Sequence, residues 1–269
     1  MGKLLALVAV VLGFVLLFKP RLVPWLLRRL GRSVHDVGQV GRELSSGEEE
    51  PGSALARYEV QAGELVLLKV NARVSPSTDP QLQEEVQTLG ERLAAAARLQ
   101  EIPYRFVAID DEEPQAFAVP GGSVFVSRGL IELCAGSRDA LAGVLGHEVA
   151  HIDLRHAILQ LAARAAAKGG ARLLTLGRTV LLGRLAGQIE ELLVQGYSRE
   201  SELEADRRGA ELALGAGFDP RGLARLLRRL AARDPGPEPL WKVFRYFSSH
   251  PPVEERIRRL EARYGTASR

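Results

Sequence analysis

The stretch Gly146-His147-Glu148-Val149-Ala150-His151 decides how the rest of the chain is interpreted. It lies within a helical pattern that Ser137 can cap and that starts near Arg138, and we expect this helix to continue past His156. Histidines at positions i and i+4 lie about 40° apart on one helical face, so both rings can reach one tetrahedral ion. The glutamate after the first histidine points towards the neighbouring side, where a metal-bound water would lie. The motif therefore predicts a zinc site with Glu148 as general base and then general acid.

Two histidines need a third protein ligand, and several residue types can be considered for it. No histidine stands six residues after His151, and His156 has the wrong spacing to bind the same ion. We therefore expect His156 to have a structural role or to support a ligand. Cys134, the single cysteine, lies upstream in an apolar context and is expected to be a small buried residue.

A carboxylate from a second helix is the remaining option for the third ligand. The segment 197–206 (YSRESELEAD) offers glutamates at three positions. Glu202 and Asp206 are one turn apart, so Glu202 can bind the ion while Asp206 accepts a hydrogen bond from a ligand histidine. Glu200 and Glu204 have the same spacing, but an ordinary solvated helix face shows that pattern too. We therefore favour Glu202 as the third ligand.

The sequence patterns in the rest of the domain predict an α+β fold that is predominantly helical and contains a small β-sheet. An amphipathic helix is expected from Asp79 or Pro80 to about Leu99, whereas the segment from Tyr58 to Val74 is ambiguous. The alternating patterns that follow predict three short strands and one further helix. These elements are Tyr104–Ile109, Gln115–Val119 and Ser123–Val126 as strands, and Arg128–Cys134 as the helix.

The N-terminal segment has the pattern of a membrane anchor. Leu4 to Phe18 is an apolar run of about 22 Å as a helix, shorter than the ~30 Å hydrocarbon core. No small-residue cleavage site follows it, which favours an uncleaved anchor over a cleaved signal peptide. Residues 22–44 resemble an amphipathic helix on the membrane surface, with Trp25 near the interface. We expect residues 1–44 to be an anchor with one span and an interfacial helix, 45–54 a polar linker, and 55–269 the domain with the metal site.

The positive charge of the chain is concentrated at its N-terminus. The net charge is +3, but residues 1–35 hold six Lys or Arg and no acidic residue, which leaves −3 for the remainder. A basic segment beside an apolar one indicates anionic lipid as the partner and not nucleic acid. Basic flanks tend to stay in the cytoplasm, so we expect the catalytic body on that side of the membrane. The oligomeric state is not readable from the sequence.

Four ordered motifs resemble those of the membrane-associated zinc metallopeptidases that include HtpX and the CaaX prenyl proteases. They are Gln115–Gly122 (QAFAVPGG), Gly146–His151, Ser198-Arg199 with Glu202 and Ala205-Asp206, and Ser249–Pro252 (SHPP) with Glu255-Arg256-Ile257. The resemblance spans residues 75 to 262 and implies a zincin-like zinc metalloprotease domain with one Zn²⁺ per chain.

The resemblance also implies roles for residues around the motif. It implies Glu202 as the third ligand and His250 near the oxyanion of the tetrahedral intermediate. It implies that the strand with Ala116, Phe117 and Ala118 pairs with protein or peptide substrates in extended conformation. The family usually has asparagine where Gln115 stands, which puts a polar contact there in doubt.

A second departure concerns residues 157–196, where the resemblance to HtpX would place membrane spans. Basic residues interrupt this segment, and no run of 18 apolar residues exists in it. We therefore expect a helical hairpin over the cleft that does not cross the membrane.

Two functions are compatible with these patterns. The first is a zinc-dependent endopeptidase that acts in protein quality control at a membrane. The second is a membrane-tethered chaperone-like or interaction protein in which zinc is only structural. The presence of Glu148 favours the endopeptidase, because a structural zinc site does not need that residue.

Overall fold

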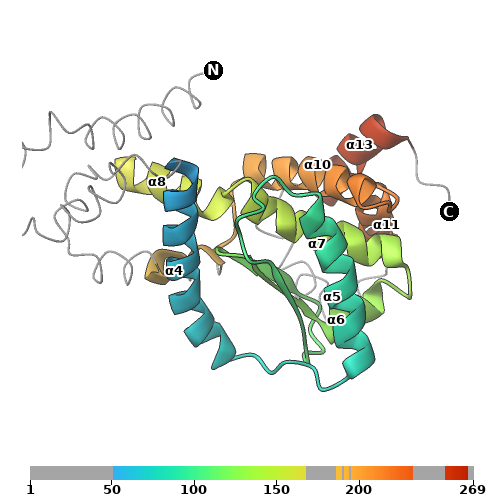
Figure 1. The fold of residues 1–269 in the computed structure, drawn as a ribbon. Coiled ribbons are helices and arrows are strands. Elements are labelled where there is room, and N and C mark those ends of the chain that lie inside the picture. Colours follow the sequence, from blue (N-terminus) through green and yellow to red (C-terminus); the bar gives the residue numbers. More distant parts are fainter. Residues whose placement is uncertain (1–50, 168–185, 190, 194, 233–251, 266–269) are drawn as a thin grey trace, which may run out of the picture.

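The computed structural model describes residues 51–167, 186–189, 191–193, 195–232 and 252–265 (Figure 1). This part of the chain is mostly helical with a three-stranded sheet, as predicted. Its elements are α4 (Pro51–Asn71), α5 (Pro80–Ala95), β1 (Arg105–Ile109), β2 (Ala116–Val119), β3 (Ser123–Ser127), α6 (Arg128–Leu133), α7 (Arg138–Asp153), α8 (His156–Ala167), α10 (Arg199–Gly215), α11 (Gly222–Ala232) and α13 (Val253–Tyr264).

The predicted membrane anchor, residues 1–44, lies outside the described residues. So does the middle of the predicted hairpin over the cleft, residues 168–185. In the part that the structure describes, no helix is both long and apolar enough to cross a membrane.

The sheet has the strand order β1-β3-β2. β1 runs parallel to β3 and β2 runs antiparallel to it, with Phe117 opposite Phe125. Alternate residues of β3 enter two hydrophobic clusters on opposite faces of the sheet, because side chains alternate along a strand. Val124 and Val126 pack towards α5 and α7, while Phe125 packs towards α4 and α8. β2 therefore lies at an edge of a sheet whose central strand is buried on both faces.

The first described helix, α4, begins within the predicted linker. Four residues of the predicted linker, Pro51–Ala54, are helical, and the ambiguous segment after Tyr58 continues the same helix. α4 packs Ala62 and Val66 into the cluster on the α8 side of the sheet, and Gly63 lets its backbone approach Pro120 closely. The reason for the difference is tertiary, since burial against the sheet stabilises a helix that its local pattern specifies weakly.

The predicted continuous helix past His156 is wrong. α7 ends at Asp153, Leu154 closes it, and α8 begins at His156. The break lies at Arg155, which has a φ of 53°, a left-handed conformation that is uncommon for residues other than glycine. The Arg155 side chain lies 3.7 Å from buried Glu59 and 3.2 Å from Glu101. These ion pairs accompany a helix break that no glycine or proline marks in the sequence.

Candidate metal centre and active site

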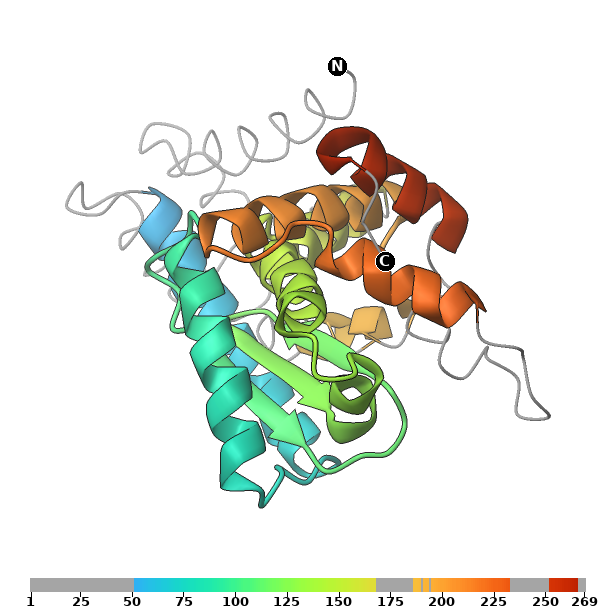
Figure 2. The same ribbon diagram turned by 90° about the vertical axis from the view of Figure 1, so that its right-hand side faces the viewer.

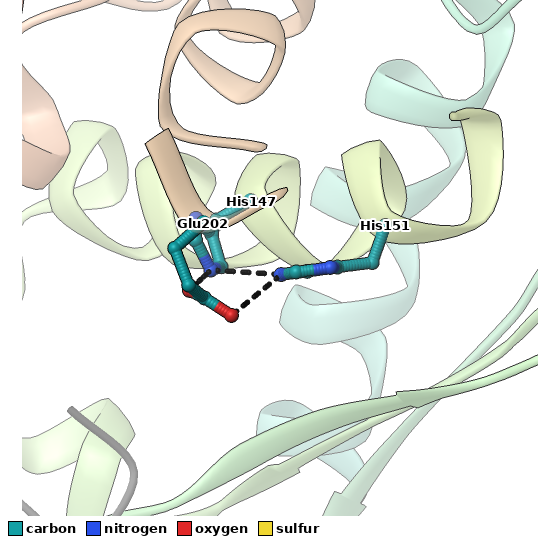
Figure 3. A group of neighbouring side chains, drawn as sticks. All are labelled: His147, His151 and Glu202. Carbon is teal, nitrogen blue, oxygen red and sulfur yellow. Dashed lines mark hydrogen bonds and ion pairs between the residues drawn. The ribbon is translucent and has the colours of Figure 1, made fainter. Parts of the chain in front are cut away.

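Three buried side chains from two helices converge at one point (Figure 3). The Nε2 atoms of His147 and His151 lie 3.1 Å apart. The carboxylate of Glu202 lies 3.2 Å from Nε2 of His147 and 3.6 Å from Nε2 of His151. All three side chains are almost completely excluded from solvent. The structure thus brings together the three residues that the sequence predicts as metal ligands.

The donor set and its spacing fit a metal ion. Ligand atoms about 2.05 Å from a tetrahedral ion lie about 3.3 Å from one another, and the observed separations of 3.1–3.6 Å bracket that value. Two imidazoles and one carboxylate form the set that catalytic zinc sites use, with a fourth position left for water or substrate. A buried carboxylate of this kind also calls for a compensating cation.

A close crossing of α10 over α7 brings the ligands together (Figure 2). Gly146 and Gly209 meet at the crossing, where a Cβ on Gly209 would lie 2.7 Å from the backbone nitrogen of His147. Next to Gly209, Nε of Arg208 donates a hydrogen bond of 2.7 Å to Asp153 at the end of α7. Because α10 starts at the Ser198 cap, its first two turns then face the histidines of α7.

Asp206 links the metal site to the C-terminal helix. Its Oδ1 lies 2.9 Å from Nδ1 of His147, the contact that the spacing to Glu202 predicts. Arg256 of α13 donates two hydrogen bonds to the same carboxylate, at 2.6 and 2.7 Å, and is completely buried. Although burial opposes it, the charge of Arg256 and its hydrogen bonds lower the pKa of Asp206 to about 2. Asp206 therefore stays ionised and holds the Nδ1 proton of His147.

The carboxylate pair around His147 changes the proton affinity of that ring. Burial alone would lower the pKa of His147, but the hydrogen bonds to Asp206 and Glu202 raise it to about 9. Both carboxylates therefore favour the protonated ring. Because a histidine ligand has to be neutral, metal binding at this ring competes with protonation.

Glu148 lies beside the ligands and faces the edge strand. Burial raises the pKa of Glu148 to about 7 in the metal-free site, while His147 and a backbone hydrogen bond from Ala118 lower it. Its Oε1 has no hydrogen-bond partner among the described residues. A carboxylate with a pKa near neutrality can both take up and return a proton, which suits a general base.

Two aromatic residues enclose the ring of His151: Tyr197, which the sequence analysis did not assign to the site, and His156, for which it expected a structural role or the support of a ligand. Tyr197 stacks on it with ring centroids 4.1 Å apart, and His156 meets its edge at 5.0 Å. Burial raises the pKa of the Tyr197 hydroxyl, and the nearby carboxylates of Glu148 and Glu202 raise it further, so the hydroxyl stays protonated. The position of Tyr197 directly before the Ser198 cap was the one sequence signal that could have pointed to it.

The other residues that the sequence analysis considered differ in their burial and contacts. Glu200 is exposed, and the Glu204 side chain is 52% exposed. Cys134 is buried, as predicted. Gln115 donates a side-chain hydrogen bond of 2.6 Å to Asp111. His250 lies outside the described residues.

A buried His-His-Glu cluster with a neighbouring glutamate and an edge strand defines the class of metallopeptidase domains. Comparison with known proteins agrees with this class. The model of the family described as "Peptidase family M48" matches residues 80–264, which is more than half of the chain. The chain belongs to this family.

Several curated relatives are similar to this chain. It is 32% identical over 201 residues to the mitochondrial metalloendopeptidase OMA1 of Schizosaccharomyces pombe, covering 73% of the chain and 57% of that protein. It is 30% identical over 192 residues to the beta-barrel assembly-enhancing protease of Escherichia coli, covering 66% of the chain and 39% of that protein. A protease HtpX homolog of Salinibacter ruber is 33% identical over 229 residues, with 72% of the chain and 78% of the relative covered. The chain thus spans only part of the first two relatives.

Proposed function

We propose that this chain is a zinc-dependent endopeptidase in which His147, His151 and Glu202 bind one Zn²⁺. The observation that carries the proposal is the geometry of these ligands, whose atoms all lie within 4.8 Å of one another. The donor set suits zinc, which binds two histidines and one carboxylate in hydrolytic enzymes. Membership of the metallopeptidase family and the names of the relatives support the same activity.

The roles of the other side chains follow from their positions. A zinc ion bound at the site supplies a Lewis acid that polarises the scissile carbonyl and makes water more acidic. Glu148 takes the proton of the attacking water and returns it to the leaving amine. Asp206 holds the proton on Nδ1 of His147, so that Nε2 keeps its lone pair for the metal. We assign His250 to the oxyanion on the family resemblance.

An extended substrate would pair with the outer edge of β2. The backbone N–H of Ser127 donates to the carbonyl of Gln115 at 2.8 Å. Hydrogen-bonded and non-bonded pairs alternate in an antiparallel ladder, so the backbone groups of Ala116 and Ala118 point away from β3. Ala118 also meets Glu148 through its backbone, so this edge runs past the catalytic carboxylate. The arrangement supports recognition of a peptide strand by β-addition, with Ala116, Phe117 and Ala118 as its binding residues.

Location is the second part of the proposal. We place the domain on an N-terminal anchor at a membrane, with the catalytic body in the cytoplasm and a role in protein quality control. The basic flank of the apolar run supports this orientation. A protease added to spheroplasts should leave a C-terminal tag intact until lysis. Digestion of the tag before lysis would place the enzyme on the other side.

Removal of the metal separates an endopeptidase from a tethered chaperone-like protein with structural zinc. The purified full chain should cleave casein, lose this activity with a chelator, and regain it with added zinc. Zinc bound at one equivalent without any cleavage of unfolded substrates would favour the chaperone-like alternative.

A further inference from the structure

His156 makes a contact with His151 that the helical spacing does not predict. Residues five apart on a continuous helix point about 140° apart, so His151 and His156 would face different sides. The break at Arg155 changes this geometry and brings Nδ1 of His156 to 3.0 Å from Nδ1 of His151. Both rings are buried, so water does not substitute for this contact.

The positions of the protons follow from the direction of each ring. Nε2 of His151 faces His147 and Glu202, so a metal ion would bind this nitrogen. A neutral imidazole that ligates through Nε2 carries its proton on Nδ1. This N–H can then donate to Nδ1 of His156 only if that nitrogen is unprotonated. His156 is then a neutral ring with its proton on Nε2, which lies 3.6 Å from Oε2 of Glu204.

We propose that His156 is a positioning residue that fixes the tautomer and ring orientation of His151. The inference rests on the proposed metal site and assigns a role that neither the ligand set nor the comparisons contain. Tyr197 stacks on the face of the His151 ring and restrains its plane, while His156 restrains the rotation of the ring within that plane. The two ligand histidines are consequently supported by different acceptors. His147 has a carboxylate held by Arg256, whereas His151 has a neutral imidazole.

The acceptor on His156 should have a measurable effect on metal affinity. A carboxylate or imidazole that accepts the second N–H of a ligand histidine typically contributes about 10- to 100-fold to metal affinity. Loss of the acceptor at Nδ1 of His156 should therefore weaken zinc binding by that factor without removing a ligand. It should act on affinity and on the ligand field, and not on the fold of the metal-free protein.

The test uses three variants of the full chain, each combined with Glu148→Gln to prevent self-cleavage. His156→Asn keeps an acceptor oxygen close to the Nδ1 position. His156→Gln places its amide near the Nε2 position, and His156→Leu has no acceptor. Zinc affinity is measured by competition with a chromophoric chelator, and cobalt(II) spectra report the ligand field. Circular dichroism and thermal unfolding of the metal-free proteins report the fold.

We expect the Gln and Leu variants to bind zinc about 10- to 100-fold more weakly than the parent, with shifted cobalt spectra, and the Asn variant to stay within a few-fold. If the Leu variant does not fold, the Asn and Gln pair alone decides. Unchanged affinity in the Gln variant, or equal losses in Asn and Gln, would overturn the positioning role. If the parent, Glu148→Gln with His156 intact, binds no zinc, both this inference and the proposed function are overturned. If it binds zinc tightly, the variants test the role of His156 alone.

Discussion

Glu202 and Asp206, one helical turn apart, face different nitrogen atoms of the histidines. Glu202 is fully buried and faces the Nε2 atoms of both histidines, whereas Asp206 faces Nδ1 of His147. The same spacing joins Glu200 and Glu204, but both of these lie on the exposed side of α10. Burial therefore distinguishes the pair Glu202 and Asp206, which faces the histidines, from the pair Glu200 and Glu204, which has the same spacing but is solvated.

The assignment of the third ligand predicts the outcome of three substitutions. Glu202→Ala should lower the zinc content of the purified protein, because it removes one of three protein ligands. Glu200→Ala and Glu204→Ala should retain one zinc per chain, since neither carboxylate belongs to the cluster of His147, His151 and Glu202. Metal analysis by mass spectrometry measures all three, and full zinc occupancy in the Glu202 variant would remove that residue from the site.

At the scale of elements, the crossing of α7 and α10 sets the position of the ligands. A methyl group on Gly209 would meet backbone atoms of α7 at 2.7–2.9 Å. Gly209→Ala should therefore destabilise the fold by about 1–3 kcal/mol and weaken zinc binding, because α10 has to move away from α7.

Gly187→Ala is the matched control for this prediction. Its Cβ would meet nothing within 4 Å among the described residues. Thermal unfolding and zinc titration compare the two variants. A Gly209 variant with the stability and affinity of the control would show that the close crossing does not position the site.

Helix α4 has its own pH-dependent contact with the break after α7. Burial raises the pKa of Glu59 from its ordinary value of 4.5 to about 7, although the Arg155 charge lowers it. The folded protein then binds this proton more tightly than the unfolded chain. Its contribution to stability is fully present at low pH and is lost as the pH rises from about 4.5 to 7.

Glu59→Gln should remove this dependence. Relative to the parent, the variant should be more stable at pH 8 than at pH 5 by roughly 2 kcal/mol, since one pKa unit corresponds to about 1.4 kcal/mol. Denaturant unfolding followed by circular dichroism at both pH values measures the difference. Glu64→Gln, an exposed change on the same helix, is the control. Equal effects of the two variants at both pH values would show that burial does not raise the pKa of Glu59.

At the scale of the whole molecule, the sequence predicts the elements better than their junctions. The His-Glu-x-x-His motif, the strand positions and the cap at Ser137 are local signals, and the structure places each near its expected position. The break at Arg155 has no local pattern that marks it, and its ion pairs join residues far away in the chain.

The site shows the same division between local and distant signals. The spacing within each helix predicts His147, His151, Glu202 and Asp206, because all four lie on regular helices. Tyr197 reaches the site from an irregular segment, and Arg256 reaches it from a helix 50 residues beyond Asp206. Their contacts depend on how the elements pack and not on any period in the sequence.

The most direct test of the central claim is proteolysis by Glu148→Gln, measured together with its zinc content. The account predicts one zinc per chain in this variant, because all three ligands remain, and a loss of casein cleavage by about 10²- to 10⁴-fold, because the general base is gone. Cleavage at the parent rate by a variant free of contaminating protease would contradict the mechanism.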